Sequence, residues 1–290
     1  MIVCPTHLAR LESENQQLFC PICNYVASKK VDGSIYFEPS FEKSPDYDAA
    51  GLEILYKAEQ NHFWFSNRIN VIRSVFKKYI PKDKYIIEIG AGTGSVARAL
   101  IKEGYRVATG ELYPQGLHYA KKYGITERYQ FNIYHTPFKE HFDVCCMFDV
   151  IEHLDDDCQA LKNVGLMLKE KGFLVLTVPA HSWLWNTDDV VSGHKRRYEP
   201  RELTNLVENA GFDVVECKNF FLSILPLLYL RKLLKRDTKQ PEEEKKLEPI
   251  EINFFINIIL DGITQIENIL CRNLRPTVGG SIILIARKKG

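Results

Sequence analysis

Three glycines stand at alternate positions, Gly90, Gly92 and Gly94, directly after the apolar run 85–89. Glycine accepts a positive φ and has no side chain to hold a ligand away from the backbone. A buried strand, a glycine-rich turn and a helix start, in that order, are typical of a nucleotide-cofactor pocket. The spacing differs from G-x-G-x-x-G, which argues against a nicotinamide oxidoreductase. A glycine-rich turn without a ligand remains the alternative.

Two carboxylates accompany this turn. Glu88 lies inside the apolar run, and Glu111 follows the next apolar run, 105–109. An acidic residue about 20 positions after the glycines, at a strand end, is placed to accept the ribose hydroxyl groups of an adenosine. Glu111 fits that position, although alone it would be an ordinary loop carboxylate.

The stretch 181–198 has little periodicity and carries histidines, tryptophans and a basic run. Long loops inside compact domains are usually functional. His194 is the first candidate for a general base, because an unperturbed imidazole titrates near neutral pH. Arg196 and Arg197 are candidates for holding an anionic acceptor. The alternative is a solvated loop whose tryptophans only pack as a lid.

The N-terminal segment contains two x₂-spaced pairs of metal-ligand residues, Cys4 with His7 and Cys20 with Cys23. Two such pairs can complete a tetrahedral zinc site of three thiolates and one imidazole. Four protein ligands leave no open position, so we expect a structural role. The alternative is a reduced arm with scattered thiols.

The elements that must position these groups follow from the alternation of apolar runs and helical patterns along 81–290, which predicts a doubly wound α/β sheet. Of the 290 residues, 45% are apolar and 26% charged, as in soluble globular proteins. The net charge of +1 argues against a nucleic-acid partner. We see no secretory signal and no apolar run long enough to span a membrane, and we expect a cytoplasmic protein.

Three stretches carry a resemblance to a known family. The pattern E-x-G-x-G-x-G over 88–94 resembles motif I of the class I S-adenosylmethionine (SAM) methyltransferases. The stretch 142–154, with D-V-I-E-H-L, resembles motif IV of the ubiquinone- and lipid-type members. Residues 1–40 resemble the zinc ribbon in front of some of these enzymes, with His7 where a cysteine is usual. The resemblance implies a seven-stranded, Rossmann-like sheet whose last strand is antiparallel.

The same resemblance implies residue roles. Arg68, on a helix before the core, corresponds to an arginine that faces the carboxylate of SAM. Phe148 and Asp149 would lie beside the methionine end, and Asn132 and Ile133 near the adenine. The implied cofactor site consists of Arg68, Glu88, Gly90, Ala91, Gly92, Gly94, Glu111, Leu112, Asn132, Ile133, Phe148 and Asp149.

The pair Glu152 and His153 leaves three interpretations open. It orients the following helix, His153 acts as a general base, or Asp149, Glu152 and His153 hold a divalent ion for a catechol-like acceptor. The candidate catalytic residues are therefore His194 and His153.

We expect four segments: a zinc ribbon over 1–40, entry helices over 41–80, a SAM-binding domain over 81–290, and a helical insertion in it over 219–278. Within the insertion, residues 255–270 show an apolar helical face. It is interpreted as a cap or homodimer contact, or as a peripheral membrane patch.

The predicted function is SAM-dependent methylation, O-directed, of a small, sugar or lipid-linked acceptor. The alternatives are an RNA-modifying methyltransferase and a non-catalytic SAM-binding partner subunit.

Overall fold

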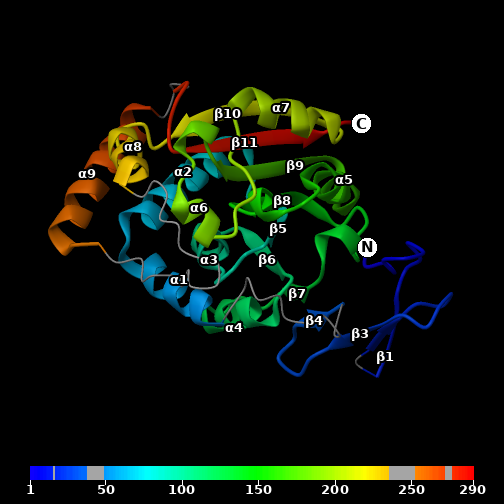
Figure 1. Cartoon of the computed structure of the whole chain (residues 1–290). Coiled ribbons are helices and arrows are strands. Elements are labelled where there is room, and N and C mark those ends of the chain that lie inside the picture. Colours follow the sequence, from blue (N-terminus) through cyan, green and yellow to red (C-terminus); the bar gives the residue numbers. More distant parts are fainter. Residues whose placement is uncertain (16, 38–48, 235–251, 272–275) are drawn as a thin grey trace.

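The computed structural model describes the chain except residues 16, 38–48, 235–251 and 272–275, so residues 41–48 of the predicted entry-helix segment lie outside the described residues. One sheet runs through the whole molecule (Figure 1). Its eleven strands have the order β1-β2-β3-β4-β7-β6-β5-β8-β9-β11-β10.

The last seven strands of that order form the predicted core. They are β5 (Tyr85–Ile89), β6 (Arg106–Glu111), β7 (Arg128–Gln130), β8 (Phe142–Phe148), β9 (Leu168–Pro179), β10 (Phe212–Phe220) and β11 (Ser281–Lys288). Strands β5 to β9 pair in parallel, whereas β11 is antiparallel to both β9 and β10. The predicted Rossmann-like sheet with an antiparallel last strand is therefore confirmed.

Helices cover both faces of this sheet, because its strands are apolar on both sides. Neighbours Ile86 and Ile87 are both fully buried and belong to opposite cores. One core contains α2 (Phe63–Tyr79) and α3 (Ser95–Lys102), and the other contains α5 (Asp157–Met167) and α7 (Pro200–Asn209). Helix α4 (Pro114–Lys122) lies beside β6 and β7.

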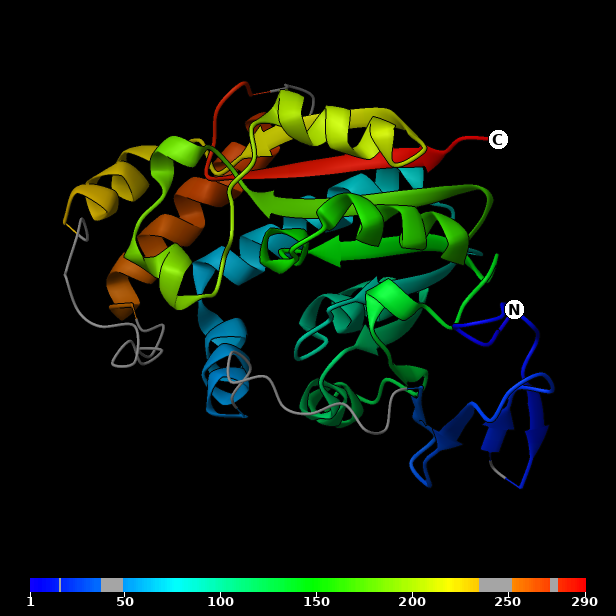
Figure 2. The ribbon, with the colours of Figure 1, turned by 45° about the vertical axis from the view of Figure 1, so that its right-hand side comes forward.

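The N-terminal strands are β1 (Glu12–Glu14), β2 (Gln17–Phe19), β3 (Val26–Lys29) and β4 (Ile35–Tyr36). They form an antiparallel meander that extends the core sheet, because β4 pairs in parallel with β7. Figure 2 shows this blue segment at one edge of the molecule. Arg128, only 3% exposed, ties the two parts together by donating to the carbonyl oxygen of Asp32 at 2.6 Å.

The remaining helices lie toward the other end. Helix α1 (Ala49–Asn61) precedes α2, and α8 (Leu225–Leu234) and α9 (Phe254–Leu270) occupy the predicted insertion between β10 and β11. Short elements complete the loops: η1 (Ile133–His135), η2 (Ile151–His153), η3 (Ser182–Leu184) and α6 (Thr187–Val191).

Candidate functional site

The glycine-rich turn connects β5 to α3 at the carboxyl edge of the parallel strands, where open α/β sheets bind ligands. Gly90, Gly92 and Gly94 have φ values of +67°, +56° and +81°. A Cβ atom on Gly90 would lie 2.6 Å from a methyl carbon of Val150. The turn therefore needs glycine both for its backbone conformation and for space.

Two buried carboxylates adjoin the turn as the sequence predicts. Glu111, at the end of β6, accepts a hydrogen bond from the backbone N–H of Gly92. Burial raises its pKa to about 7, although backbone N–H groups partly offset this. Glu88 is 3% exposed, and burial raises its pKa to about 8. Its Oε2 atom has no hydrogen-bond partner among the described residues.

Arg68 and Asp149, both predicted to contact the methionine part of SAM, form an ion pair with each other. Their side chains are 11% and 25% exposed. Thr177 on β9 also donates to Asp149, at 3.1 Å. Asp149 has a φ of +54°, which is uncommon for a residue other than glycine. A partly buried arginine and carboxylate thus stand together at the end of β8.

Sequence reasoning missed Glu59 at the same place. This α1 residue accepts hydrogen bonds from Thr93 in the glycine-rich turn and, at 2.8 Å, from Ser95. Burial raises its pKa, and Arg68 acts in the opposite direction. An acidic residue on a helix surface gives no signal in the sequence, because only the tertiary structure brings α1 to the turn.

The predicted adenine-side residues lie on the β6 and β7 ends. Asn132 uses its side-chain oxygen to accept from the N–H of Tyr134, 2.9 Å away, and so begins η1. Ile133 is 8% exposed. The backbone oxygen of Leu112 accepts from Gln130 at 3.0 Å.

The two remaining residues of the predicted cofactor site are Ala91, in the glycine-rich turn, and Phe148, at the end of β8. Both are buried.

Both predicted catalytic histidines come together where the loops after β8 and β9 meet. The rings of His153 and His194 are 4.8 Å apart. Nδ1 of His194 lies 2.8 Å from Asp189, a carboxylate that is 1% exposed. Burial opposes ionisation of Asp189, yet hydrogen bonds from His194 and Arg197 hold its pKa below the usual value. An ionised Asp189 fixes the proton on Nδ1 and leaves Nε2 as the acceptor.

Nε2 of His194 faces Glu152, whose Oε1 is 4.0 Å away. Glu152 is fully buried, and neither of its carboxyl oxygens is hydrogen-bonded to another described side chain. Burial raises the pKa of Glu152 well above its ordinary value. Burial, reinforced by His194, lowers the pKa of His153 to about 4, so this imidazole is a weak base.

Arg196 and Arg197, candidates for holding an anionic acceptor, are bound within the chain. Arg196 donates to Asp157 at 2.8 Å, and Arg197 donates to Asp189 at 2.8 Å. Both therefore stabilise the loop that carries His194.

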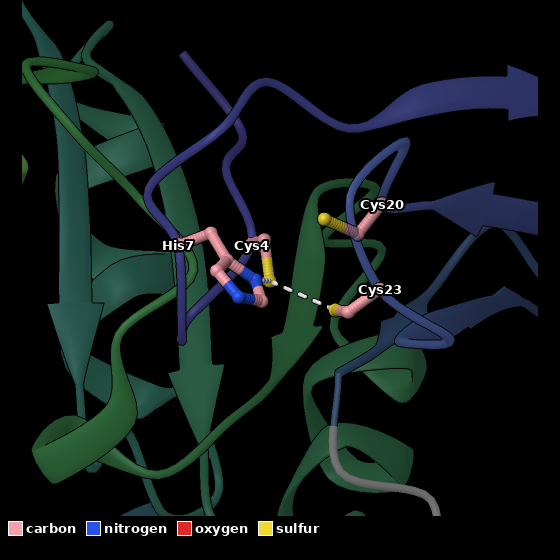
Figure 3. Close-up of side chains that lie close together, drawn as sticks. All are labelled: Cys4, His7, Cys20 and Cys23. Atoms are coloured by element: carbon pink, nitrogen blue, oxygen red, sulfur yellow. Dashed lines mark hydrogen bonds between the residues drawn. The ribbon is translucent and has the colours of Figure 1, made fainter.

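The four predicted zinc ligands converge from two loops of the N-terminal segment (Figure 3). Their ligand atoms lie within 4.8 Å of one another. Sγ of Cys4 is 3.9 Å from Sγ of Cys23 and 3.7 Å from Nδ1 of His7. A tetrahedral zinc ion with Zn–S bonds of about 2.3 Å holds its sulfur atoms about 3.8 Å apart. The donor set and spacing of these residues fit such an ion.

The carboxyl edge of the sheet also fits SAM, which carries a sulfonium cation, an amine and a carboxylate. Oε2 of buried Glu88 has no hydrogen-bond partner among the described residues, and burial raises the pKa values of Glu88 and Glu111, so a cationic or hydrogen-bonding ligand would stabilise these carboxylates. Arg68, which is paired with Asp149 here, has the guanidinium geometry that suits a ligand carboxylate. A separate cavity of about 570 Å³ between α2, β10 and α9 contains none of the predicted site residues.

Comparisons with known proteins show the family and the fold of this chain. A family model described as a methyltransferase domain matches residues 56–217. A probable SAM-dependent methyltransferase of Mycolicibacterium smegmatis is 29% identical over 174 residues, which are 57% of this chain and 64% of that protein. A ubiquinone biosynthesis O-methyltransferase of Coxiella burnetii is 23% identical, over 51% of this chain and 74% of that protein.

A solved structure of a Haemonchus contortus phosphoethanolamine N-methyltransferase with SAM matches with a TM-score of 0.55. It is 18% identical and covers 85% of this chain and 58% of that chain, a likeness that shows the fold. The first curated relative is matched over slightly less than two thirds of its length. Because the family model spans more than half of the sequence, the chain belongs to the methyltransferase-domain family of class I SAM-dependent enzymes.

Proposed function

We propose that this protein transfers a methyl group from SAM to a hydroxyl group of a small, sugar or lipid-linked acceptor. The observation that carries the proposal is that two arrangements stand at the carboxyl ends of the parallel strands. One is the glycine-rich turn with its buried carboxylates and the Arg68–Asp149 pair, and the other is His194 held by Asp189.

The residues around the glycine-rich turn bind SAM and orient it. Glu111 is positioned to accept ribose hydroxyl hydrogen bonds, in exchange for its present bond from Gly92. Arg68 offers its guanidinium to the ligand carboxylate, which frees Asp149 to meet the ligand amine. When bound, SAM supplies an activated methyl group for in-line transfer. The chain contributes alignment, which can account for a large part of the rate enhancement.

The acceptor half removes a proton. Nε2 of His194 takes the acceptor hydroxyl proton, and ionised Asp189 stabilises the resulting imidazolium. His153, with a pKa of about 4, serves better to pack and orient His194. A relative named for ubiquinone O-methylation supports a hydroxyl acceptor. RNA modification and a non-catalytic partner role remain the competing functions.

The N-terminal segment is proposed to hold one structural Zn²⁺ on Cys4, His7, Cys20 and Cys23. Burial alone would raise the pKa of Cys20, but the backbone N–H groups of Ile22 and Cys23, together with hydrogen bonds to the thiols of Cys4 and Cys23, lower it to about 7, which favours the thiolate.

The decisive experiment is binding and transfer with the purified chain. We expect calorimetry to show saturable binding of SAM and its demethylated product, and labelled SAM to transfer its methyl group into a lipid, sugar or small-molecule fraction. Uptake of NADH with no response to SAM would overturn the proposal. Labelling confined to RNA would establish the competing function.

Substitution of His194 tests the acceptor half. His194→Ala and Asp189→Asn should each keep SAM affinity while turnover falls about 100-fold or more, because a general base is lost or misoriented. His118→Ala, at an exposed position on α4, is the matched control and should keep both. Unchanged turnover in His194→Ala would exclude the assigned base.

A further inference from the structure

Helix α9 turns its polar side toward the protein. Asn257 accepts from the N–H of Phe63 at 2.9 Å. Asp261 accepts from Asn67 at 2.7 Å and from Ser66 at 3.1 Å. These bonds fasten α9 along α2, a pairing that Figure 2 shows as orange beside cyan.

Glu267 extends this polar attachment. It is 7% exposed, and its two oxygens accept from the backbone N–H groups of Leu222 and Ser223 at 2.8 and 2.7 Å. The segment that leads into α8 is therefore fixed to α9 by a buried carboxylate. Both acidic residues of α9 bond to neighbouring elements of the chain.

The opposite side of α9 is apolar and exposed, the reverse of an ordinary surface helix. Its exposed apolar side chains have exposed fractions between 41% and 74%. We call this the outer face of α9; it consists of Phe254, Phe255, Ile256, Ile258, Ile259, Ile263, Ile266, Ile269 and Leu270. No charged residue interrupts it.

Helix α8 continues the same character nearby. Its exposed residues include Leu230 at 50% and Leu234 at 77%, and its last turn carries Arg231 and Lys232. Arg231 pairs with Asp188, and Lys232 donates to the backbone oxygen of Trp183; both cations are neighbours of the exposed leucines along α8. Figure 1 places α8 and α9 side by side at one end of the molecule.

Two amphipathic aromatic residues join this end to the loop that carries His194. Trp183 is 41% exposed and Tyr229 is 48% exposed, and their rings are 6.1 Å apart. Tryptophan and tyrosine concentrate where an apolar phase meets water. The arrangement is an apolar face with aromatic and cationic residues beside it.

We propose that the outer face of α9, with the exposed leucines of α8, docks on an anionic lipid bilayer surface. Protein interfaces are generally only somewhat more apolar than other surface, are rich in arginine and tyrosine, and have polar rims. The outer face itself contains no tyrosine, arginine or other charged residue, whereas a tryptophan, a tyrosine and two cations lie beside it on α8 and the neighbouring loop, the residue types that accompany an apolar face at an anionic bilayer. Among the described helices, none is long and apolar enough to cross a membrane.

Vesicle flotation tests this docking with the full chain. We expect it to float with vesicles of phosphatidylglycerol and phosphatidylcholine, and to bind less with phosphatidylcholine alone. Ile259→Gln, Ile263→Gln and Ile266→Gln combined should reduce the bound fraction about tenfold or more, because the buried apolar area is lost. Glutamine favours the helix, so α9 should still form.

A double variant, Val31→Gln with Val215→Gln, is the matched control, because both valines are exposed elsewhere. It should float like the unaltered chain, and both variants should keep its melting temperature and SAM affinity. A chain that never floats, or a triple variant that floats undiminished, would overturn the proposal. Sedimentation showing a dimer that only the triple variant dissociates, without flotation, would assign the face to a second copy instead. Flotation and sedimentation do not measure methyl transfer, so these results leave the proposed function unaffected.

Discussion

At the scale of single residues, the pocket is defined by carboxylates held out of water without enough positive charge. Glu59, Glu88 and Glu111 all have pKa values raised by burial, and Arg68 is paired with Asp149. Keeping such groups buried costs stability unless they remain protonated. A cationic ligand would relieve that cost, which is a physical reason why this edge of the sheet suits a sulfonium compound.

Glu88 gives a prediction about pH. Its pKa rises from the ordinary 4.5 to about 8 in the folded chain, so between these values the folded state binds more protons than the unfolded state. Stability then falls as pH rises, by up to about 1.4 kcal/mol per pH unit from this group. In urea unfolding without ligand, the free energy of unfolding of Glu88→Gln should exceed that of the unaltered chain. The difference should grow between the two pKa values, 4.5 and about 8, and stay constant at higher pH. A gain that does not change with pH would contradict the assignment.

At the scale of elements, the glycine-rich turn packs against a helix that lies outside the glycine motif in the sequence. Gly116, in the first turns of α4, would place a Cβ 2.7 Å from the backbone oxygen of Gly92 and 2.9 Å from Cγ of Glu111. The helix therefore packs directly on the turn and on the carboxylate. The glycine spacing over 90–94 gives no hint of this third partner.

A pair of glycine substitutions separates this packing from helix propensity. Gly165, inside α5, would place a Cβ 3.7 Å from the Phe212 ring, an ordinary contact. Gly165→Ala should stabilise the chain by about 0.5–1 kcal/mol, as alanine does in helices. Gly116→Ala should instead lose about 1–3 kcal/mol and weaken SAM binding, because backbone must shift. Denaturant unfolding measures the stability of each variant, and calorimetry measures its SAM binding. Equal effects of the two substitutions on stability would refute the close approach of α4 to the turn at Gly116.

At the scale of the whole molecule, the N-terminal segment shares one sheet with the methyltransferase core. Strand β4 pairs with β7, and β7 lies next to the Glu111 end of β6. Phe37 donates to the backbone oxygen of Gln130 at 2.9 Å, and Gln130 in turn reaches Leu112. Loss of order at the metal-ligand loops would thus reach the cofactor side.

Removal of zinc should therefore affect both stability and binding. Stoichiometric zinc is expected by metal analysis, and Cys20→Ser or chelation should lower the melting temperature by about 5 °C or more and weaken SAM binding. Cys158→Ser, on α5 and outside the cluster, should change neither. A chain without zinc whose stability ignores Cys20→Ser would show that the four residues are not a metal site.

The sequence by itself determined the alternation of strands and helices in the core sheet, because apolar runs and a glycine-rich turn are local patterns along the chain, whereas the antiparallel last strand was implied by the family resemblance and the pairing of β4 with β7 came from the tertiary structure. It also brought forward Glu88, Glu111, the four metal-ligand residues and both histidines. Glu59, Gly116 and Asp189 gave no comparable signal. Their roles arise where α1, α4 and the loop after β9 meet the strand ends.

Only the tertiary structure decided the orientation of α9. The sequence shows a two-sided helix, and burial of the apolar side is the usual outcome. Here hydrogen bonds from α2 and from the segment before α8 satisfy Asn257, Asp261 and Glu267, and these bonds turn the apolar side outward. Periodicity reports that a helix has two faces. Which face meets the protein depends on partners distant in the chain, as does the pairing of Arg68 with Asp149.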